Sequence, residues 1–95
     1  MRINRVIWYG KFVDKLWDKH RVDVREAEEA LQNHKRVRRV RRGHVKGEDV
    51  YVALGQTDEG RYLAVFFIHK KSHDAIVISA RDMGSAERRE YERKG

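Results

Sequence analysis

The spacing of the apolar residues changes once along this chain, and the change limits the folds that it can form. Up to about residue 33 the apolar side chains recur every three or four positions, as on one face of an α-helix. Phe12 and Leu16 show this spacing within a predicted helix over Lys11–Lys19. Val13 and Trp17 repeat it, which makes one wide apolar stripe. From residue 36 onward the apolar residues alternate or form short runs, so the chain predicts two helices followed by a sheet.

The start of the second helix is indicated by its capping residues. Asp23 fits the N-cap position, and Glu26 stands three residues later, which is the spacing of a capping box. Val22 and Ala27 occupy the positions of a hydrophobic staple. We expect this helix to run to about Gln32.

Four strands are expected after the helices, at Arg36–Arg42, Asp49–Leu54, Arg61–Ile68 and Ala75–Ala80. Short loops join them, so consecutive strands should pair antiparallel. The segment Arg5–Trp8 allows an extra N-terminal strand, and Gly84 and Ser85 open a last helix with Ser85 as its N-cap. The predicted fold is α+β, a single domain over residues 1–95. Its four-stranded antiparallel sheet has the first two helices on one face and a short C-terminal helix.

The basic residues are concentrated in one short stretch. The chain has 22 lysine and arginine residues against 15 aspartate and glutamate residues, which gives a formal net charge of +7. Seven of the basic residues lie between Lys35 and Lys46, where no acidic residue occurs. Without those seven the charges balance at 15 against 15, so the whole excess comes from this stretch. Such clustering is typical of proteins that bind polyanions, and we expect RNA to be the partner.

The composition also bears on the compartment. Cysteine is absent, so neither a disulfide nor thiolate chemistry is available. The most apolar window, Leu63–Ile68, is strand-length and much shorter than the ~20 residues of a membrane span. We therefore expect a cytoplasmic protein without a signal peptide or a membrane segment.

Short motifs occur along the chain in a recognisable order. Trp8 near the start is followed by Lys19–Val22, which reads Lys-His-Arg-Val. A segment rich in glutamate and alanine comes next, Arg25–Ala30. It is followed by a turn that contains arginine, histidine, glycine and glutamate, Arg42–Glu48.

The second half of the chain continues this order. Leu54–Arg61 contains Leu-Gly and then a Thr-Asp-x-Gly-Arg hairpin. The clearest motif is Ile-Ser-Ala-Arg at Ile78–Arg81, followed by Glu-Arg-x-x-Tyr at Glu87–Tyr91. As an ordered set, from about Ile7 to Arg93, these motifs make the chain resemble BrnT-type toxins of bacterial type II toxin–antitoxin systems.

The resemblance implies a small basic endoribonuclease with a fold related to the RelE toxins. Such a toxin cleaves RNA without a metal ion and inhibits translation, and no cofactor is expected. The resemblance also implies a cognate antitoxin, of the ribbon-helix-helix type, that forms a hetero-oligomer with the toxin.

Metal-independent RNA cleavage makes three demands on a site. The 2′-hydroxyl that attacks the neighbouring phosphorus must lose its proton, the phosphorane oxygens must be stabilised, and the leaving 5′-oxygen must gain a proton. Arginine suits the second task, because its planar fork contacts two oxygens and stays charged. The residues of the basic stretch predicted to bind RNA are Arg38, Arg39, Arg41, Arg42 and Lys46.

The predicted catalytic residues are His44, Glu48, Arg81, Arg88 and Tyr91. Arg81 either contacts the scissile phosphate or pairs with Glu87 or Glu90 to hold the last helix. Arg88 shares a helix face with Tyr91, which either donates a proton or stacks on a base, or else anchors the helix to the sheet. Histidine as a residue type can serve as an acid or a base near neutral pH, so His44 is either an acid–base group, with Glu48 orienting it or acting as the base, or a solvated loop residue.

Two other functions are compatible with the sequence at this point. A non-catalytic nucleic-acid-binding module would use the basic stretch to bind phosphates and break no bond, and a protein-interaction domain would use it to bind an acidic partner. Salt-dependent binding without cleavage distinguishes the first of these from a nuclease. His20 is interpreted as structural, and His69 and His73 do not predict a zinc site.

Overall fold

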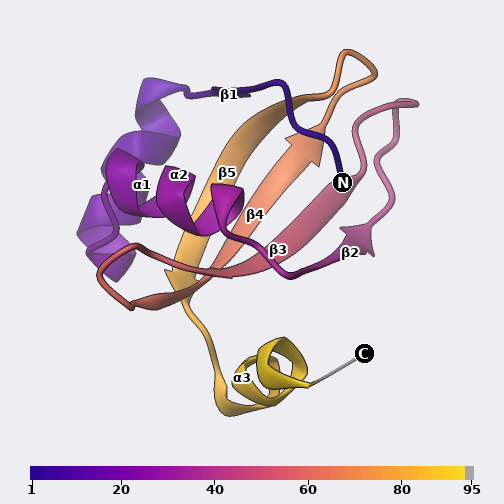
Figure 1. The fold of residues 1–95 in the computed structure, drawn as a ribbon. Coiled ribbons are helices and arrows are strands. Elements are labelled where there is room, and N and C mark those ends of the chain that lie inside the picture. The colour runs from indigo at the N-terminus through magenta and orange to yellow at the C-terminus, as the bar shows by residue number, and fades with distance from the viewer. Residues whose placement is uncertain (94–95) are drawn as a thin grey trace.

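Helices give way to strands at the position where the apolar period changes. The computed structural model describes residues 1–93, which form three helices and five strands (Figure 1). In chain order the elements are β1 (Arg5–Ile7), α1 (Gly10–His20), α2 (Val24–Gln32), β2 (Arg36–Arg41), β3 (Val50–Gln56), β4 (Tyr62–His69), β5 (Asp74–Asp82) and α3 (Ser85–Glu92). The predicted α+β class is confirmed, and the extra N-terminal strand is present.

The strands of the described residues form one sheet in the order β1-β5-β4-β3-β2. The pairs from β2 to β5 are antiparallel, as expected. β1 instead pairs parallel with β5, with Arg5 opposite Asp74 and Ile7 opposite Ile76. The sheet is therefore mixed and five-stranded rather than antiparallel and four-stranded. A three-residue strand is too short for its alternation to reveal its pairing partner.

The first two helices cover one face of the sheet, as predicted (Figure 1). α1 packs on β5, and α2 packs on β3 and β4. The core between these layers draws side chains from both, among them Leu16, Leu31, Leu63, Phe67 and Val77. Burying each of the larger ones contributes about 1.5–3 kcal/mol to stability.

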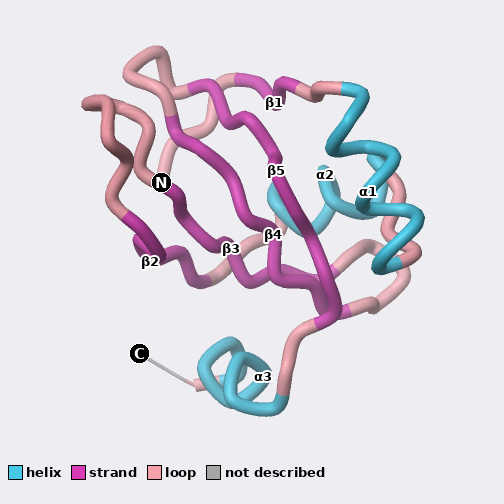
Figure 2. Tube along the Cα trace, turned by 180° about the vertical axis from the view of Figure 1, so that it is seen from behind, coloured by secondary structure: helices cyan, strands magenta, loops and turns pink. Residues whose placement is uncertain are grey.

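The opposite face of the sheet, which we call the open face, is covered by a helix at one end (Figure 2). Neighbouring strand residues point to opposite faces, so Val52 and Leu54 lie on the open face while Ala53 lies in the helix-covered core. α3 packs here through Tyr91, which is 7% exposed and contacts Tyr62. Beyond α3 the open face is uncovered.

The helix starts follow the local sequence. Asp23 accepts a hydrogen bond from the Glu26 backbone N–H at 2.8 Å, and Glu26 accepts one from the Asp23 N–H at 3.2 Å, which confirms the predicted capping box. α3 has Gly84 rather than Ser85 as its N-cap, because the Glu87 carboxylate accepts the Gly84 N–H at 2.8 Å. No helix within residues 1–93 is long and apolar enough to cross a membrane.

Arg61 ties the ends of several elements together. Its guanidinium donates to the backbone carbonyls of His20 and Arg21, at 3.0 and 2.7 Å, where α1 ends. It also forms salt bridges with Glu26 of α2 at 3.1 Å and with Asp82 of β5 at 2.8 Å. One rigid fork that satisfies two carbonyls and two carboxylates holds the end of α1 beside the end of β5.

Replacing Arg61 with methionine should lower the free energy of unfolding by about 2–3 kcal/mol, because the partly buried Glu26 carboxylate and two backbone carbonyls lose their donor. Urea denaturation followed by circular dichroism measures the change. Arg25→Met is the matched control, since its salt bridge with Glu59, at 3.6 Å, is exposed. That loss should cost no more than about 0.5 kcal/mol. Equal losses in the two variants would mean that Arg61 acts only as a surface charge.

Candidate nucleic-acid interface

A β-bulge in β2 determines which arginines of the basic stretch share a face. Arg36 and Arg38 pair with open-face residues of β3, so they lie on the open face themselves. Unbroken alternation would send Arg41 to the other face. The register shifts after Arg39, however, and Arg41 then pairs with Val50 on the open face. The bulge therefore adds a third arginine to this face.

A second bulge, in β5, has the same effect on Arg81. Ile76 pairs with Ile68 of the open face, so unbroken alternation would turn Arg81 toward α1 and α2. The register shifts so that Ser79 pairs with Phe66, and Arg81 follows on the open face two positions later. Bulges commonly re-aim a side chain in this way next to functional sites.

The two bulges place Arg41 and Arg81 around one hollow, which we call the central cavity. Its volume is about 390 Å³. Its other lining residues are His20, Val40, Val50, Phe66, Ile78 and Ser79. Arg41 is exposed and forms no salt bridge within residues 1–93. Two cations therefore border a largely apolar floor on the open face.

Arg81 forms one of the contacts predicted for it, the pair with Glu87 that holds the last helix. Its Nη1 and Nη2 bind the two Glu87 carboxylate oxygens at 2.6 and 2.9 Å, and Nη1 also donates to the Asp82 carbonyl at 3.2 Å. These bonds use three of the five N–H groups of the guanidinium. The Nε–H and the second Nη2–H form another fork on the adjacent side, and no partner within residues 1–93 binds it. Arg81 thus anchors α3 and still presents a charged fork.

A second hollow, the turn cavity, adjoins the central cavity and shares Arg41 with it. Its volume is about 350 Å³, and its other lining residues are Arg42, Gly43, His44, Glu48 and Ile68. The predicted pair of His44 and Glu48 therefore lines one cavity. Glu48 forms a salt bridge with Lys70 at 3.5 Å, while no hydrogen bond joins it to His44 in the described structure. The pair is close to the basic stretch, as the sequence suggested.

Gly43 and Asp49 hold the turn that carries these residues. The Gly43 N–H donates to the Asp49 carboxylate at 2.7 Å, and this bond lowers the pKa of Asp49. A Cβ at position 43 would lie 2.4 Å from the Glu48 carbonyl oxygen, so the turn requires glycine there. Arg39 pairs with Asp49 at 3.3 Å and lines neither cavity.

Arg88 and Tyr91 gather around Tyr62, at the other end of the open face from the turn cavity. The guanidinium carbon of Arg88 lies 3.5 Å from the Tyr62 ring centroid, and Arg88 pairs with Glu92 at 2.8 Å. Tyr91 meets the same ring edge-on, with the centroids 5.6 Å apart. Its burial favours the anchoring role among those predicted for Tyr91. Neither Arg88 nor Tyr91 lines the central cavity.

The basic strand and the last helix meet over the open face, and acidic side chains take part in the contact. Arg38 pairs with Glu90 at 3.5 Å, and Arg36 donates to the Glu90 carbonyl at 3.3 Å. Together with the Glu87 bond to Arg81, these contacts hold α3 in place. The remaining basic residues predicted to bind RNA, Arg42 and Lys46, are exposed in the loop after β2.

The central cavity also contains residues that sequence reasoning did not assign to a site. Phe66 lies in a strand that is apolar on both faces, so only the pairing shows which face is open. The His20 carbonyl accepts a hydrogen bond from Arg61, and His20 also lines the central cavity together with Ser79. The Lys-His motif at the end of α1 was the signal available in the sequence.

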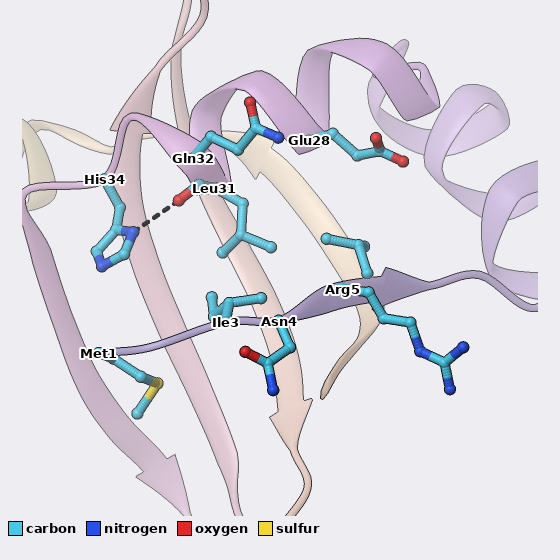
Figure 3. Close-up of a pocket in the computed structure, with 9 residues that line it drawn as sticks. Met1, Ile3, Asn4, Arg5, Glu28, Leu31, Gln32 and His34 are labelled. Carbon is cyan, nitrogen blue, oxygen red and sulfur yellow. Dashed lines mark hydrogen bonds between the residues drawn. The ribbon is translucent and has the colours of Figure 1, made fainter. Parts of the chain in front are cut away.

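A third hollow lies under β1 and contains none of the predicted site residues (Figure 3). Ile3 and Leu31 face each other there, and the His34 Nδ1 lies 2.6 Å from the Leu31 carbonyl oxygen. Its volume is about 350 Å³, and Arg5 and Glu28 border it with opposite charges. A polyanion therefore finds no concentrated positive charge here.

The bond between Arg81 and Glu87 predicts a pH dependence of stability. Hydrogen bonds from Arg81 lower the pKa of Glu87, so this contribution is present above the ordinary glutamate pKa and is lost as pH falls through the lowered value. Urea denaturation between about pH 7 and pH 2 should show wild type losing its advantage over Glu87→Gln as the pH falls. Glu59→Gln, at an exposed pair, is the control. An advantage that does not change with pH would contradict the assignment.

A known protein family matches most of the chain. A family model described as the ribonuclease toxin, BrnT, of type II toxin–antitoxin systems matches residues 10–87. The matched range contains the basic stretch, both cavities' arginines and the His44 turn, and it ends within α3. No curated protein matches the chain.

Proposed function

Because this chain belongs to the BrnT family of ribonuclease toxins of type II toxin–antitoxin systems, we propose that it cleaves RNA on the open face of its sheet without a metal ion. The supporting observation is the fork of Arg81 that no partner within residues 1–93 binds, at the central cavity that Arg41 also lines. A phosphodiester that enters this cavity meets the two parallel N–H donors of Arg81, and Arg41 borders the same cavity from β2.

The proposed reaction moves phosphorus from the 5′-oxygen of one nucleotide to the 2′-oxygen of the preceding ribose. The 2′-hydroxyl loses its proton to a base and attacks phosphorus. The bond from phosphorus to the 5′-oxygen breaks, and that oxygen receives a proton. The products are one end with a 2′,3′-cyclic phosphate and one end with a 5′-hydroxyl.

Each predicted catalytic residue has its own proposed role in this reaction. Arg81 stabilises the charge on the phosphorane oxygens through its Nε–H and Nη2–H. From the turn cavity, His44 accepts or donates a proton in the reaction. Glu48 either orients the His44 imidazole or acts as the base itself. Arg88 adds positive charge near the RNA, and Tyr91 keeps α3 in position through Tyr62.

The basic stretch binds the RNA backbone on either side of the reacting phosphate. Its proposed contacts are Arg38, Arg39, Arg41, Arg42 and Lys46. Binding should weaken steeply with salt, because each phosphate contact releases condensed counterions. Arg39 and Arg38 contribute less than Arg41 in this proposal, because Asp49 and Glu90 already pair with them.

Membership of the family implies an antitoxin partner. We propose that this partner is a ribbon-helix-helix protein and that the two form a hetero-oligomer in the cytoplasm. The proposed substrate is messenger RNA, and its cleavage inhibits translation.

An RNA oligonucleotide incubated with the purified protein in excess EDTA should yield fragments with cyclic phosphate ends, detected by mass spectrometry. A DNA oligonucleotide of the same sequence should stay intact, because it lacks the attacking 2′-hydroxyl. RNA that stays intact with and without added magnesium would contradict the proposed activity. Cleavage that appears only after magnesium is added would contradict metal independence alone.

A further inference from the structure

The floor of the central cavity is apolar although the surface around it is cationic. Val40, Val50, Phe66 and Ile78 form this floor, between Arg41 and Arg81. Val40 is 46% exposed, although it lies within the most basic segment of the chain. An exposed apolar patch that is bordered by charges commonly marks a binding surface.

The arrangement of Phe66 and Arg81 suggests what this surface binds. The Arg81 guanidinium lies 5.2 Å from the centroid of the Phe66 ring, so a cation and an aromatic face meet at the edge of the floor. Aromatic rings and guanidinium planes are the groups on which proteins stack the unpaired bases of RNA. A phosphate group alone would bury no apolar surface on this floor, so the floor fits a ligand that has an apolar face.

The position of the charges fits a nucleotide better than an apolar peptide. Arg41 on β2 and Arg81 on β5 border the floor from opposite sides of the two central strands. A base on the floor therefore has a cation on each side, where the phosphates that precede and follow its ribose can reach. A volume of about 390 Å³ has room for one nucleotide.

We propose that the floor of the central cavity seats one unstacked base of the RNA next to the scissile phosphate. This inference rests on the proposed function, since it identifies the part of the substrate that the same site recognises. The base stacks against Phe66 and Arg81 and packs on Val40 and Ile78. Seating it turns the ribose and aligns its 2′-hydroxyl with the phosphorus that Arg81 binds.

Single abasic substitutions in the RNA test this assignment. An RNA 12-mer that spans a site cut by the wild-type protein is compared with copies that carry one abasic ribonucleotide at each position around the cut. One position should show a fall in kcat/KM of about 10- to 100-fold, and the other positions should change little. Phe66→Leu should lose a similar factor on the intact RNA and should then be nearly indifferent to the abasic substitution, because the two losses report one contact.

Two further variants keep the test interpretable. Val40→Ala removes part of the floor at an exposed position, so it should fold normally and show the same pattern in weaker form. Val45→Ala is the matched control, because Val45 is 58% exposed and lines neither cavity. The inference is overturned if the abasic copies are cut as fast as intact RNA, or if Phe66→Leu and Val40→Ala discriminate them as wild type does. Unchanged discrimination by these two variants is also the result expected if a protein partner, and not a base, occupies the floor. Failure of wild type to cut any RNA would instead overturn the proposed function.

Discussion

Replacing Arg81 with alanine should lower kcat/KM for RNA cleavage by about 10²- to 10³-fold, the largest effect that we expect from one substitution on the open face. The reason is that Arg81 offers two aligned donors to the phosphorane oxygens. Arg81→Lys keeps the charge without the fork and should recover only part of the activity. Initial rates on a fluorescent RNA oligonucleotide measure both variants.

The matched control is Arg89→Ala. Arg89 is exposed on α3 and forms no salt bridge within residues 1–93, so its removal changes the net charge by the same amount. It should lower the rate by less than about threefold, in line with the small effect of surface charges. Equal losses for Arg81→Ala and Arg89→Ala would contradict the account, because only the total charge would then matter. Thermal unfolding of both variants establishes that they are folded.

Replacing Gly55 with alanine should lower the free energy of unfolding by about 3–5 kcal/mol, the largest stability effect that we expect from one substitution. Gly55 lies in β3 beneath α2, and a Cβ there would stand 1.8 Å from the Ala30 carbonyl oxygen. Backbone of both elements would have to move apart to admit a methyl group. The core between them, which includes Leu31, would then lose its close packing. Urea denaturation followed by circular dichroism measures the loss.

Gly10→Ala is the control for this prediction. A Cβ at position 10 would meet no atom within 4 Å, and the position begins α1. The variant should be as stable as wild type or more stable by up to about 1 kcal/mol, because alanine favours the helix. A Gly55→Ala protein with the stability of wild type would mean that α2 does not approach β3 as closely as described.

Local sequence rules were sufficient for much of the fold. The capping box of Asp23 and Glu26 marks the start of α2, and both bonds are present. The period of the apolar residues placed the helices before the strands, because the period reports directly which side of an element is buried. β1 was harder, since its pairing with β5 joins residues about 70 positions apart and only three residues take part.

The candidate site was predictable in its residues but not in its geometry. The motifs and the charge pointed to Arg81 and to the basic stretch, yet alternation alone would place Arg41 and Arg81 on the helix-covered face. The bulges near Val40 and Ile78 reverse both of them. A bulge depends on pairing between strands, so no local pattern in one strand announces it.

The alternatives left open by the sequence depended on contacts across the sheet. Tyr91 packs on Tyr62, which supports its anchoring role. Arg81 pairs with Glu87 and also borders a cavity, so its two predicted roles are compatible rather than exclusive. Phe66 was not predicted because a central strand carries apolar residues on both faces, and a partly exposed one among them has no signature of its own.

Binding of RNA to the open face underlies the proposed cleavage and the proposed seating of a base. A short RNA with a 2′-O-methyl group on every ribose cannot be cleaved and can be titrated into isotope-labelled protein by NMR. The largest chemical-shift changes should occur at Arg41, Phe66 and Arg81, and they should diminish as salt is raised. Changes confined to the hollow under β1, at Ile3 and Leu31, with the open-face signals unmoved, would contradict binding of RNA to the open face.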